Sequence, residues 1–320
     1  MTPAKQAANE PKYSTAELKA HSVARRRANL QLMRIPWARF RKAYEEYPRW
    51  QGLALWTRAV IDAEGRAPTE LLRTLREHCP GFFEGAALPC EPNLLAFRLL
   101  EWVHNHRFGY AKRQGWLDAL SFYGVRHPRS QAAWAFWEHC EKEWSRMPPK
   151  ALPSFEEWEQ RASKMKICGE ATCLEVASAV ERYIDREATA LWLSPLFVSH
   201  IKLPAHVVSE LEQRFPSLLS RTRSGSDQRI KGDSTSWRSL IRAVRVRCLS
   251  NAKAAGWLDG FTERVRSHPR HFRFMAYGKH WGAEWSQDRR QHYPSSRQWR
   301  LAADHYSEAS SNRHHGIHSP

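Results

Sequence analysis

The sequence predicts an all-α protein made of two tandem helical repeats of about 135–140 residues, which a basic N-terminal helix precedes. Three observations lead to this prediction. One stretch of the chain matches a later one, apolar residues recur at the 3.6-residue helical period, and several segments begin with helix-capping signals. A chain of 320 residues is also long enough for about two domains. We therefore expect an internal duplication.

The strongest self-similarity joins Ala111–Arg129 to Ala252–Arg270, where the residue numbers differ by 141 and nine of 19 positions are identical. When this offset is kept, 18 of the 52 positions from 111 to 162 are identical to their counterparts. Further upstream the offset falls to 136 and aligns Ala54-Leu55-Trp56 with Ala190-Leu191-Trp192. A fixed offset over this length indicates a repeated unit rather than a shared short motif.

Four regions follow one another along the chain. Residues 1–35 form a basic N-terminal arm and helix, residues 36–165 the first repeat, residues 166–308 the second repeat, and residues 309–320 a His-rich disordered tail. The second repeat has five additional residues. We place them in a polar, Gly- and Ser-rich stretch at about 221–235, which we predict to be an exposed loop.

Individual helices are indicated by their first residues. Ser14 with Glu17, and Ser154 with Glu157, have the capping-box spacing, in which each side chain accepts a hydrogen bond from the other residue's backbone N–H. Prolines precede several periodic stretches, as the first helical turn allows, and these are Pro68, Pro128, Pro204, Pro269 and Pro294. Leu196–Leu203 also suits a strand, but it aligns with a helical stretch of the first repeat, so we predict helix there.

The aromatic residues follow the helical pattern too. The chain has 15 tryptophans, and Trp116, Trp144 and Trp158 recur in the second repeat. Aromatic side chains at helical spacing most often form the core, so we expect core packing rather than a platform on which nucleic-acid bases stack.

The charge is concentrated at the two ends of the chain. Fifty Lys and Arg against 33 Asp and Glu give a formal net charge of +17. Residues 1–50 carry 11 basic and 4 acidic groups (net +7), and residues 221–320 carry 19 and 8 (net +11). The remaining residues carry 20 basic and 21 acidic groups (net −1). This asymmetry favours a polyanionic partner for the second repeat and the N-terminal helix.

We therefore predict a non-enzymatic protein that binds nucleic acid, DNA or RNA, through phosphate contacts and without a cofactor or metal. The predicted contact residues are Arg25, Arg26, Arg27, Arg238, Arg242, Arg245, Arg247, Arg266, Arg270, Arg273, Lys279, Arg289 and Arg290. Residues 252–285 have the pattern of a helix-turn-helix with its turn at His268-Pro269, which would place Arg270 and Arg273 near a groove.

Two other functions compete with this prediction. The near-neutral first repeat suits a helical scaffold or adaptor that binds a protein partner, with the basic charge incidental. An enzyme with a site between the repeats would need Asp118, Asp259, His139 or His280 to converge in a pocket. The sequence contains none of the phosphate-binding or nucleophile motifs GxxxxGK[ST], GxGxxG and GxSxG. Nucleic-acid binding remains the leading hypothesis.

Metal ligation is disfavoured by the spacing of the candidate ligands. His139 with Glu143, and His280 with Glu284, lie four residues apart on predicted helices, which suits an intrahelical hydrogen bond or ion pair. The six cysteines, including the pair Cys168 and Cys173, match no recognised zinc spacing.

Membrane insertion is not expected either. No run approaches about 20 apolar residues, and the mean hydropathy is −0.66. The first residues, Met1–Pro11, lack the apolar stretch of a secretory signal. We therefore expect a cytoplasmic or nucleoid-associated protein whose cysteines are reduced.

Overall fold

The computed structural model describes residues 14–83, 92–147, 149, 151–198, 203–214, 249, 253, 256–287 and 292–306. The predicted loop at 221–235 and the predicted tail at 309–320 lie outside these residues. The described part of the chain is almost entirely helical, which confirms the all-α prediction. Its helices are α1 (Thr15–Leu32), α2 (Trp37–Glu64), α3 (Thr69–His78), α4 (Pro80–Phe83), α5 (Pro92–Arg113), α6 (Leu117–Gly124), α7 (Pro128–Trp144), α8 (Phe155–Ser163), α9 (Cys173–Val198), α10 (Ala205–Arg214), α13 (Leu258–Arg266), α14 (Pro269–Gln287) and α15 (Ser296–His305).

A short antiparallel hairpin joins α8 to α9. Its strands are β1 (Lys166–Cys168) and β2 (Ala171–Thr172), the only strands within the described residues. Gly169 makes the turn with a positive φ of 55°, a conformation that glycine adopts without a steric penalty. The sequence analysis did not predict this hairpin, because strands of two or three residues are too short for an alternating pattern to be recognised.

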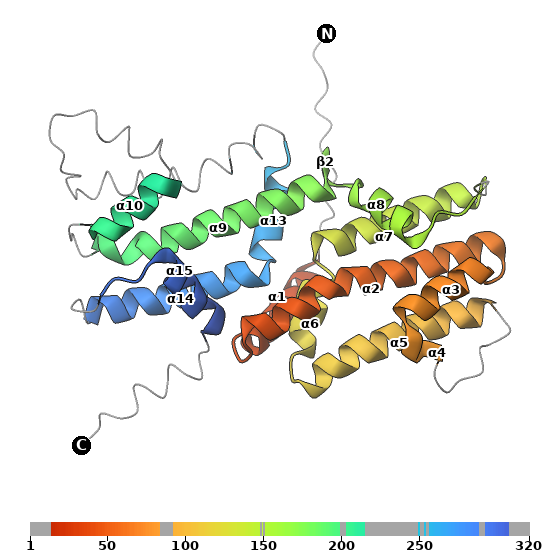
Figure 1. Cartoon of the computed structure of the whole chain (residues 1–320), viewed down its shortest axis with the longest axis horizontal. Helices are drawn as coiled ribbons and strands as arrows, with labels where there is room; N and C mark the ends of the chain where they lie inside the picture. The colour runs from red at the N-terminus through yellow and green to blue at the C-terminus, as the bar shows by residue number, and fades with distance from the viewer. Residues whose placement is uncertain are drawn as a thin grey trace, which may run out of the picture.

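Five helices of the first half recur in the same order in the described part of the second half. They are α2, α3, α6, α7 and α8, and their counterparts are α9, α10, α13, α14 and α15. The numbers of their first residues differ by 136 in the first two pairs and by 141 in the other three. In Figure 1 the first half lies to the right and the second half to the left, with α1 and α6 between them.

Local geometry also recurs at matching positions. Gly115 and Gly256 have positive φ values of 76° and 75°, and each precedes a tryptophan that is the N-cap of the next helix, α6 or α13. A glycine is needed at both positions because other residues rarely adopt this conformation. The identical Gly-Trp-Leu-Asp segments of the sequence therefore form the same turn twice.

A second recurring feature is the hydrogen bond of a buried tryptophan. The indole Nε1 of Trp56 donates to the carbonyl oxygen of Pro153 at 3.1 Å, and that of Trp192 donates to Pro294 at 2.9 Å. The residue after each proline is a serine that caps α8 or α15 in a capping box. The tryptophan thus fixes the start of α8 against α2 in the first half, and the start of α15 against α9 in the second half.

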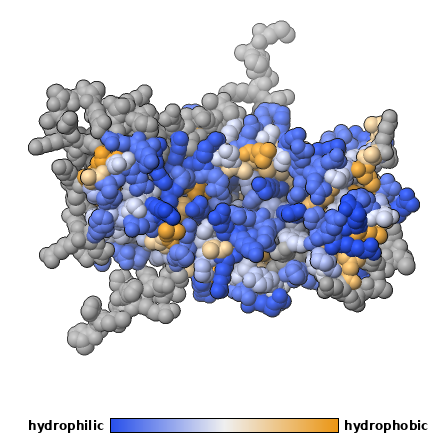
Figure 2. Space-filling model, viewed as in Figure 1, coloured by the Kyte–Doolittle hydropathy of each residue, from blue (hydrophilic) through white to orange (hydrophobic). Residues whose placement is uncertain are grey.

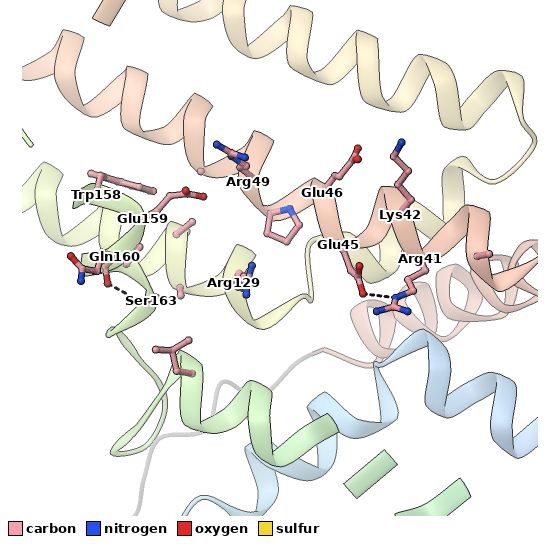
Figure 3. A pocket seen from close by; sticks show the side chains of 17 residues that line it. Arg41, Lys42, Glu45, Glu46, Arg49, Arg129, Trp158, Glu159, Gln160 and Ser163 are labelled. Carbon is pink, nitrogen blue, oxygen red and sulfur yellow. Dashed lines mark hydrogen bonds and ion pairs between the residues drawn. The ribbon is translucent and has the colours of Figure 1, made fainter. Parts of the chain in front are cut away.

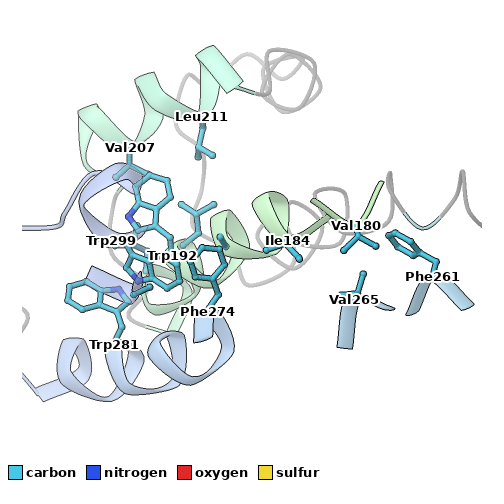
Figure 4. Packing of buried hydrophobic residues seen from close by; sticks show 14 of the residues in the cluster. Val180, Ile184, Trp192, Val207, Leu211, Phe261, Val265, Phe274, Trp281 and Trp299 are labelled. Atoms are coloured by element: carbon cyan, nitrogen blue, oxygen red, sulfur yellow. The ribbon is translucent and has the colours of Figure 1, made fainter. Parts of the chain in front are cut away.

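Three clusters of buried hydrophobic residues form the interior. One cluster fills the first half, around Trp56 and Trp158. A second fills the second half, around Trp192, Trp281 and Trp299 (Figure 4). The third joins α1 to α2 and α6. Most tryptophans therefore belong to the core, as the helical spacing predicts, although Trp134 is 42% exposed.

A fully buried arginine connects the N-terminal and C-terminal parts of the fold. Arg273 on α14 is 0% exposed. One terminal nitrogen donates to the carbonyl oxygens of Leu32 and Ile35, which lie at the corner between α1 and α2. The other donates to Asp304 at 3.3 Å and to Tyr306 at 3.1 Å, at the end of α15. Burial lowers the pKa of Arg273 to about 10, so the guanidinium remains charged at neutral pH.

Replacing this arginine should destabilise the whole fold. We expect Arg273→Met to lower the free energy of unfolding by about 3 kcal/mol or more, because four carbonyl groups lose a charged donor in the interior. Chemical denaturation monitored by circular dichroism measures this loss. Arg297→Met on the exposed surface of α15 is the control and should change the free energy by less than about 0.5 kcal/mol. A loss below about 1 kcal/mol in Arg273→Met would contradict the connecting role.

Candidate functional site

The predicted phosphate-contacting residues are only partly described by the structure. Those described are Arg25, Arg26, Arg27, Arg266, Arg270, Arg273 and Lys279. Those outside the described residues are Arg238, Arg242, Arg245, Arg247, Arg289 and Arg290. Among the described ones, Arg26, Arg27, Arg266 and Lys279 are exposed. Hydrophilic residues cover most of the face shown in Figure 2, and the hydrophobic patches on it are small and separate.

Arginines from the two ends of the chain meet beside α1. The guanidinium of Arg25 on α1 donates to the backbone carbonyl oxygen of Arg266, the last residue of α13, at 3.2 Å. These two residues are 241 positions apart in the sequence. Arg26 and Arg27 continue α1 from Arg25 and are exposed to solvent. The fold therefore brings the basic N-terminal region next to the basic second half.

Arg126 is a further cation in this region that the sequence analysis missed. It donates to the carbonyl oxygen of Phe122 at 2.8 Å and lies 4.0 Å over the Phe122 ring. Partial burial and the charges of Arg126 and Arg25 lower the pKa of His21 on α1. We call Arg25, Arg26, Arg27, Arg126 and Arg266 the basic cluster. Arg126 was overlooked because it lies in residues 51–220, whose net charge is −1. The one sequence feature that marks it is its position directly before the repeated His-Pro dipeptide.

The helix-turn-helix prediction is wrong in the placement of its key residues. Arg273 faces the interior, so it cannot contact a phosphate on the surface. Arg270 is 30% exposed, pairs with Asp304 at 3.5 Å and stacks 5.0 Å from the Phe274 ring. The physical reason is that α14 packs along α9 and α15, and these arginines point toward neighbouring helices rather than toward solvent.

The residues that an enzymatic site would require are engaged separately. His139 and His280 pair with glutamates on their own helices, at 3.6 Å to Glu143 and 3.1 Å to Glu284, which confirms the predicted intrahelical pairs. Asp118 accepts a hydrogen bond from Gln31 of α1 at 2.8 Å. The side chain of Asp259 lies outside the described residues. No three His, Cys, Asp or Glu side chains in the described ranges are grouped as a metal site would require.

Two histidines at matching positions meet at the junction of the halves. His127 and His268 precede α7 and α14, and the Nδ1 of each accepts a hydrogen bond from the backbone N–H two residues later, at 3.1 and 3.2 Å. Nδ1 is therefore unprotonated in both rings. The ring of Tyr44 lies between them, with centroid distances of 4.8 Å to His127 and 5.6 Å to His268. The Nε2 of His268 lies 3.3 Å from the Glu181 carboxylate.

These contacts keep His127 neutral. Burial and the adjacent His268 lower the pKa of His127 to about 3. A proton on Nδ1 would remove the acceptor that caps α7 and would place a charge in the interior. His127 therefore makes the stability of this junction depend on pH.

An open cleft lies in the first half, between α2, α7, α8 and the start of α9. Its volume is about 720 Å³. Small residues line it on three helices, namely Pro48 and Gly52 on α2, Ala132 and Ala133 on α7, and Ala162 on α8. A volume of this size is within the range that small-molecule ligands occupy in proteins.

Charged side chains surround the cleft. Figure 3 shows Arg49 from α2, Arg129 from α7 and Glu159 from α8 around the same space. Burial raises the pKa of the Glu159 carboxyl, and the charges of Arg49 and Arg129 partly oppose this rise. Arg41, also in the lining, is paired with Glu45 at 2.7 Å. Within the described residues, no ion pair joins Arg49 or Arg129 to a carboxylate. The cleft therefore holds two cations that other described side chains do not neutralise by direct contact.

A scan against protein-family models, a search of curated proteins and a search of solved structures return no match for this chain. The functional assignment therefore depends on the chain's own residues. None of the helices in the described ranges is both long and apolar enough to span a lipid bilayer.

The junction histidine should make the fold less stable in mild acid. The pKa of His127 is about 3 in the folded protein and about 6.5 in an unfolded chain, so the unfolded state binds the proton first as the pH falls below 6.5. We expect the free energy of unfolding to fall by about 1 to 2 kcal/mol from pH 7 to pH 5 because of this residue.

Urea denaturation at both pH values tests this expectation. His127→Asn keeps a side-chain acceptor at the N-cap but cannot titrate, so it should lose this part of the pH dependence. His139→Asn, at an exposed position on α7, is the control and should retain it. An identical pH dependence in wild type and His127→Asn would show that the histidine does not contribute.

Proposed function

We propose that this protein is a non-enzymatic nucleic-acid-binding protein that contacts phosphates through the basic cluster. The observation that carries the proposal is the contact between Arg25 and Arg266, which brings a cation of the basic first 50 residues next to one of the basic last 100. A scaffold needs charged residues for solubility, but it does not need cations from two distant basic segments to lie side by side.

The side chains in the basic cluster suit phosphate contacts. Arg26, Arg27 and Arg266 are exposed. Arginine presents a planar group of donors that matches phosphate oxygens, and several arginines in one region release counterions from a nucleic acid when it binds. The cluster offers no described base-reading element, so its contacts favour affinity over sequence preference. This supports binding to DNA or RNA with modest sequence preference.

We also infer that the two halves are copies of one ancestral unit. The matching helix starts, the paired indole hydrogen bonds of Trp56 and Trp192, and the paired histidine caps support this inference. The copies differ in charge. Residues 111–162 carry 8 basic and 7 acidic groups, whereas residues 252–303 carry 10 and 4. In this proposal the second copy acquired the charge that attracts nucleic acid, and the first copy did not.

Neutralising the cluster should weaken nucleic-acid binding and its dependence on salt. We expect Arg26→Gln, Arg27→Gln and Arg266→Gln together to reduce the slope of log K against log salt by roughly 2 to 3 on double-stranded DNA, since each lost phosphate contact removes about 0.9. Fluorescence anisotropy with labelled single- and double-stranded DNA and RNA, from about 50 to 300 mM salt, measures the slope. Arg25 stays unchanged because its contact with Arg266 positions α1.

A control of equal charge separates local contacts from net charge. The triple variant Arg66→Gln, Arg113→Gln and Arg146→Gln removes three exposed cations from the first half and should leave the slope within about 1 of wild type. Equal losses in both triple variants would remove the cluster from the interface. Absence of nucleic-acid binding even at low salt would instead favour the scaffold hypothesis, in which a protein partner binds the first half in a salt-insensitive complex.

A further inference from the structure

The cleft of the first half has a closed counterpart in the second half. The residues that line it correspond, at the offsets of 136 and 141, to positions on α9, α14 and α15. Ala132 corresponds to the buried Arg273, and Ala133 corresponds to Phe274, which is 1% exposed. Large buried side chains thus stand in the second half at the positions where the first half has the small residues that line the cleft.

The charges around the two places also differ. Arg49 and Glu159 correspond to Asp185 and Arg300, so the signs are exchanged between the halves. Arg300 and Asp185 form a direct ion pair, and Arg300 also donates to the Thr189 hydroxyl at 3.0 Å. Arg49 and Glu159 do not make the equivalent contact among the described residues. The ion pair between Arg300 and Asp185 in the second half therefore has no described equivalent between Arg49 and Glu159 in the first.

The second cation of the cleft lacks its counterpart's partner as well. Arg129 corresponds to Arg270, which pairs with Asp304 at 3.5 Å. The position of Asp304 is occupied in the first half by Ser163, whose hydroxyl donates to the Gln160 carbonyl oxygen at 2.7 Å. A serine cannot neutralise a guanidinium group. Arg129 and Arg49 thus face the same cavity from different helices. Arg129 lacks the acidic partner of its counterpart, and Arg49 forms no ion pair with Glu159 within the described residues.

We propose that this cleft is a binding site for a phosphate monoester on an organic body of about mononucleotide size. Two guanidinium groups on separate helices can share the three terminal oxygens of a phosphate, whereas a carboxylate satisfies only one guanidinium fork. Arg129 is the second residue of α7, so the positive end of the helix dipole adds to the attraction. The small side chains of the lining leave room for the organic body.

Glu159 has a defined place in this site. Its carboxyl is half-buried between the two arginines, and burial raises its pKa. A carboxyl with a raised pKa repels an arriving phosphate less than an ordinary carboxylate does. This site does not depend on the proposed nucleic-acid interface, because none of the basic cluster residues lines the cleft.

Isothermal titration calorimetry on the full chain tests the proposal with defined probes. The probes are inorganic phosphate, a nucleoside monophosphate, the same nucleoside without phosphate, and matched oligonucleotides with a 5′-phosphate or a 5′-hydroxyl. We expect saturable binding of the monophosphate and at least about tenfold weaker binding of the nucleoside. A preference for the 5′-phosphorylated over the 5′-hydroxyl oligonucleotide would identify a nucleic-acid end as the source, and its absence would identify a free phosphorylated metabolite.

Variants of the cleft give the sharpest comparison. Arg49→Gln and Arg129→Gln should each weaken binding of the monophosphate about tenfold or more. Ser163→Asp introduces the acid of the second half, so it should pair with Arg129 and abolish binding while the melting temperature is maintained. Ser163→Asn, of similar size but neutral, should bind within about twofold of wild type. Arg66→Gln, outside the cleft, should bind as wild type does.

Several results would overturn the proposal. One is the absence of heat with every phosphorylated probe at millimolar concentration. Another is equal affinity for the nucleoside and its monophosphate, or for the monophosphate and inorganic phosphate. Unchanged binding in Arg49→Gln and Arg129→Gln, with both variants folded by circular dichroism, would also exclude the cleft as the site. The triple variant of the basic cluster should bind the monophosphate normally, so failure of the nucleic-acid proposal would remain distinguishable.

Discussion

The hydrogen bonds from the buried guanidinium of Arg273 are the contact on which the arrangement of the two halves depends. They connect the corner between α1 and α2 with the end of α15, segments that lie at opposite ends of the sequence. The equivalent connection in the first half, between α8 and α9, is covalent and runs through the β1–β2 hairpin. A charged group in the interior needs hydrogen-bond partners, and four backbone carbonyls supply them to the two terminal nitrogens of Arg273. The basic cluster follows from this contact, because α1 must be held beside α13 before Arg25 can reach Arg266.

The cleft and the closed second half show how one architecture can either fill or expose the same space. Where α14 carries Arg273 and Phe274, the interior is packed and cross-connected. Where α7 carries Ala132 and Ala133, both of them buried, these small side chains line the cleft that Arg49 and Arg129 border. The helices around both places begin at corresponding positions, so the difference lies in the side chains they carry. Packing thus stabilises one copy, while the other copy retains enough room for a ligand.

Much of the helical architecture was predictable because its signals are local. The positive φ at Gly115 requires glycine, and the capping box at Ser154 consists of residues three apart, so a single sequence contains both signals. The environment of Arg273 was not predictable. Its spacing from Arg270 suits an exposed basic face and a buried connection equally well, and the carbonyls that decide between them lie far away in the sequence, as that of Leu32 does. The cleft was missed for a related reason, because it arises from small residues, and alanine or serine in a helix gives no signal of an open space beside it.

The two halves meet at two seams. At the seam between α1 and α14 they are held together by hydrogen bonds and packing, whereas at the seam between α8 and α9 the chain itself connects them through the hairpin. The two seams therefore differ in how they respond to thermal fluctuation. The hairpin keeps α8 and α9 joined even when their contacts loosen. The hydrogen bond from Arg273 to Leu32, in contrast, closes a loop that contains most of the chain. When this contact breaks, the chain regains the conformational entropy that closing the loop had cost. We therefore expect partial opening of the native state to begin where α1 meets the second half. Any partner that bridges α1 and α13 holds that seam shut, so binding there and the global rigidity of the protein are thermodynamically linked.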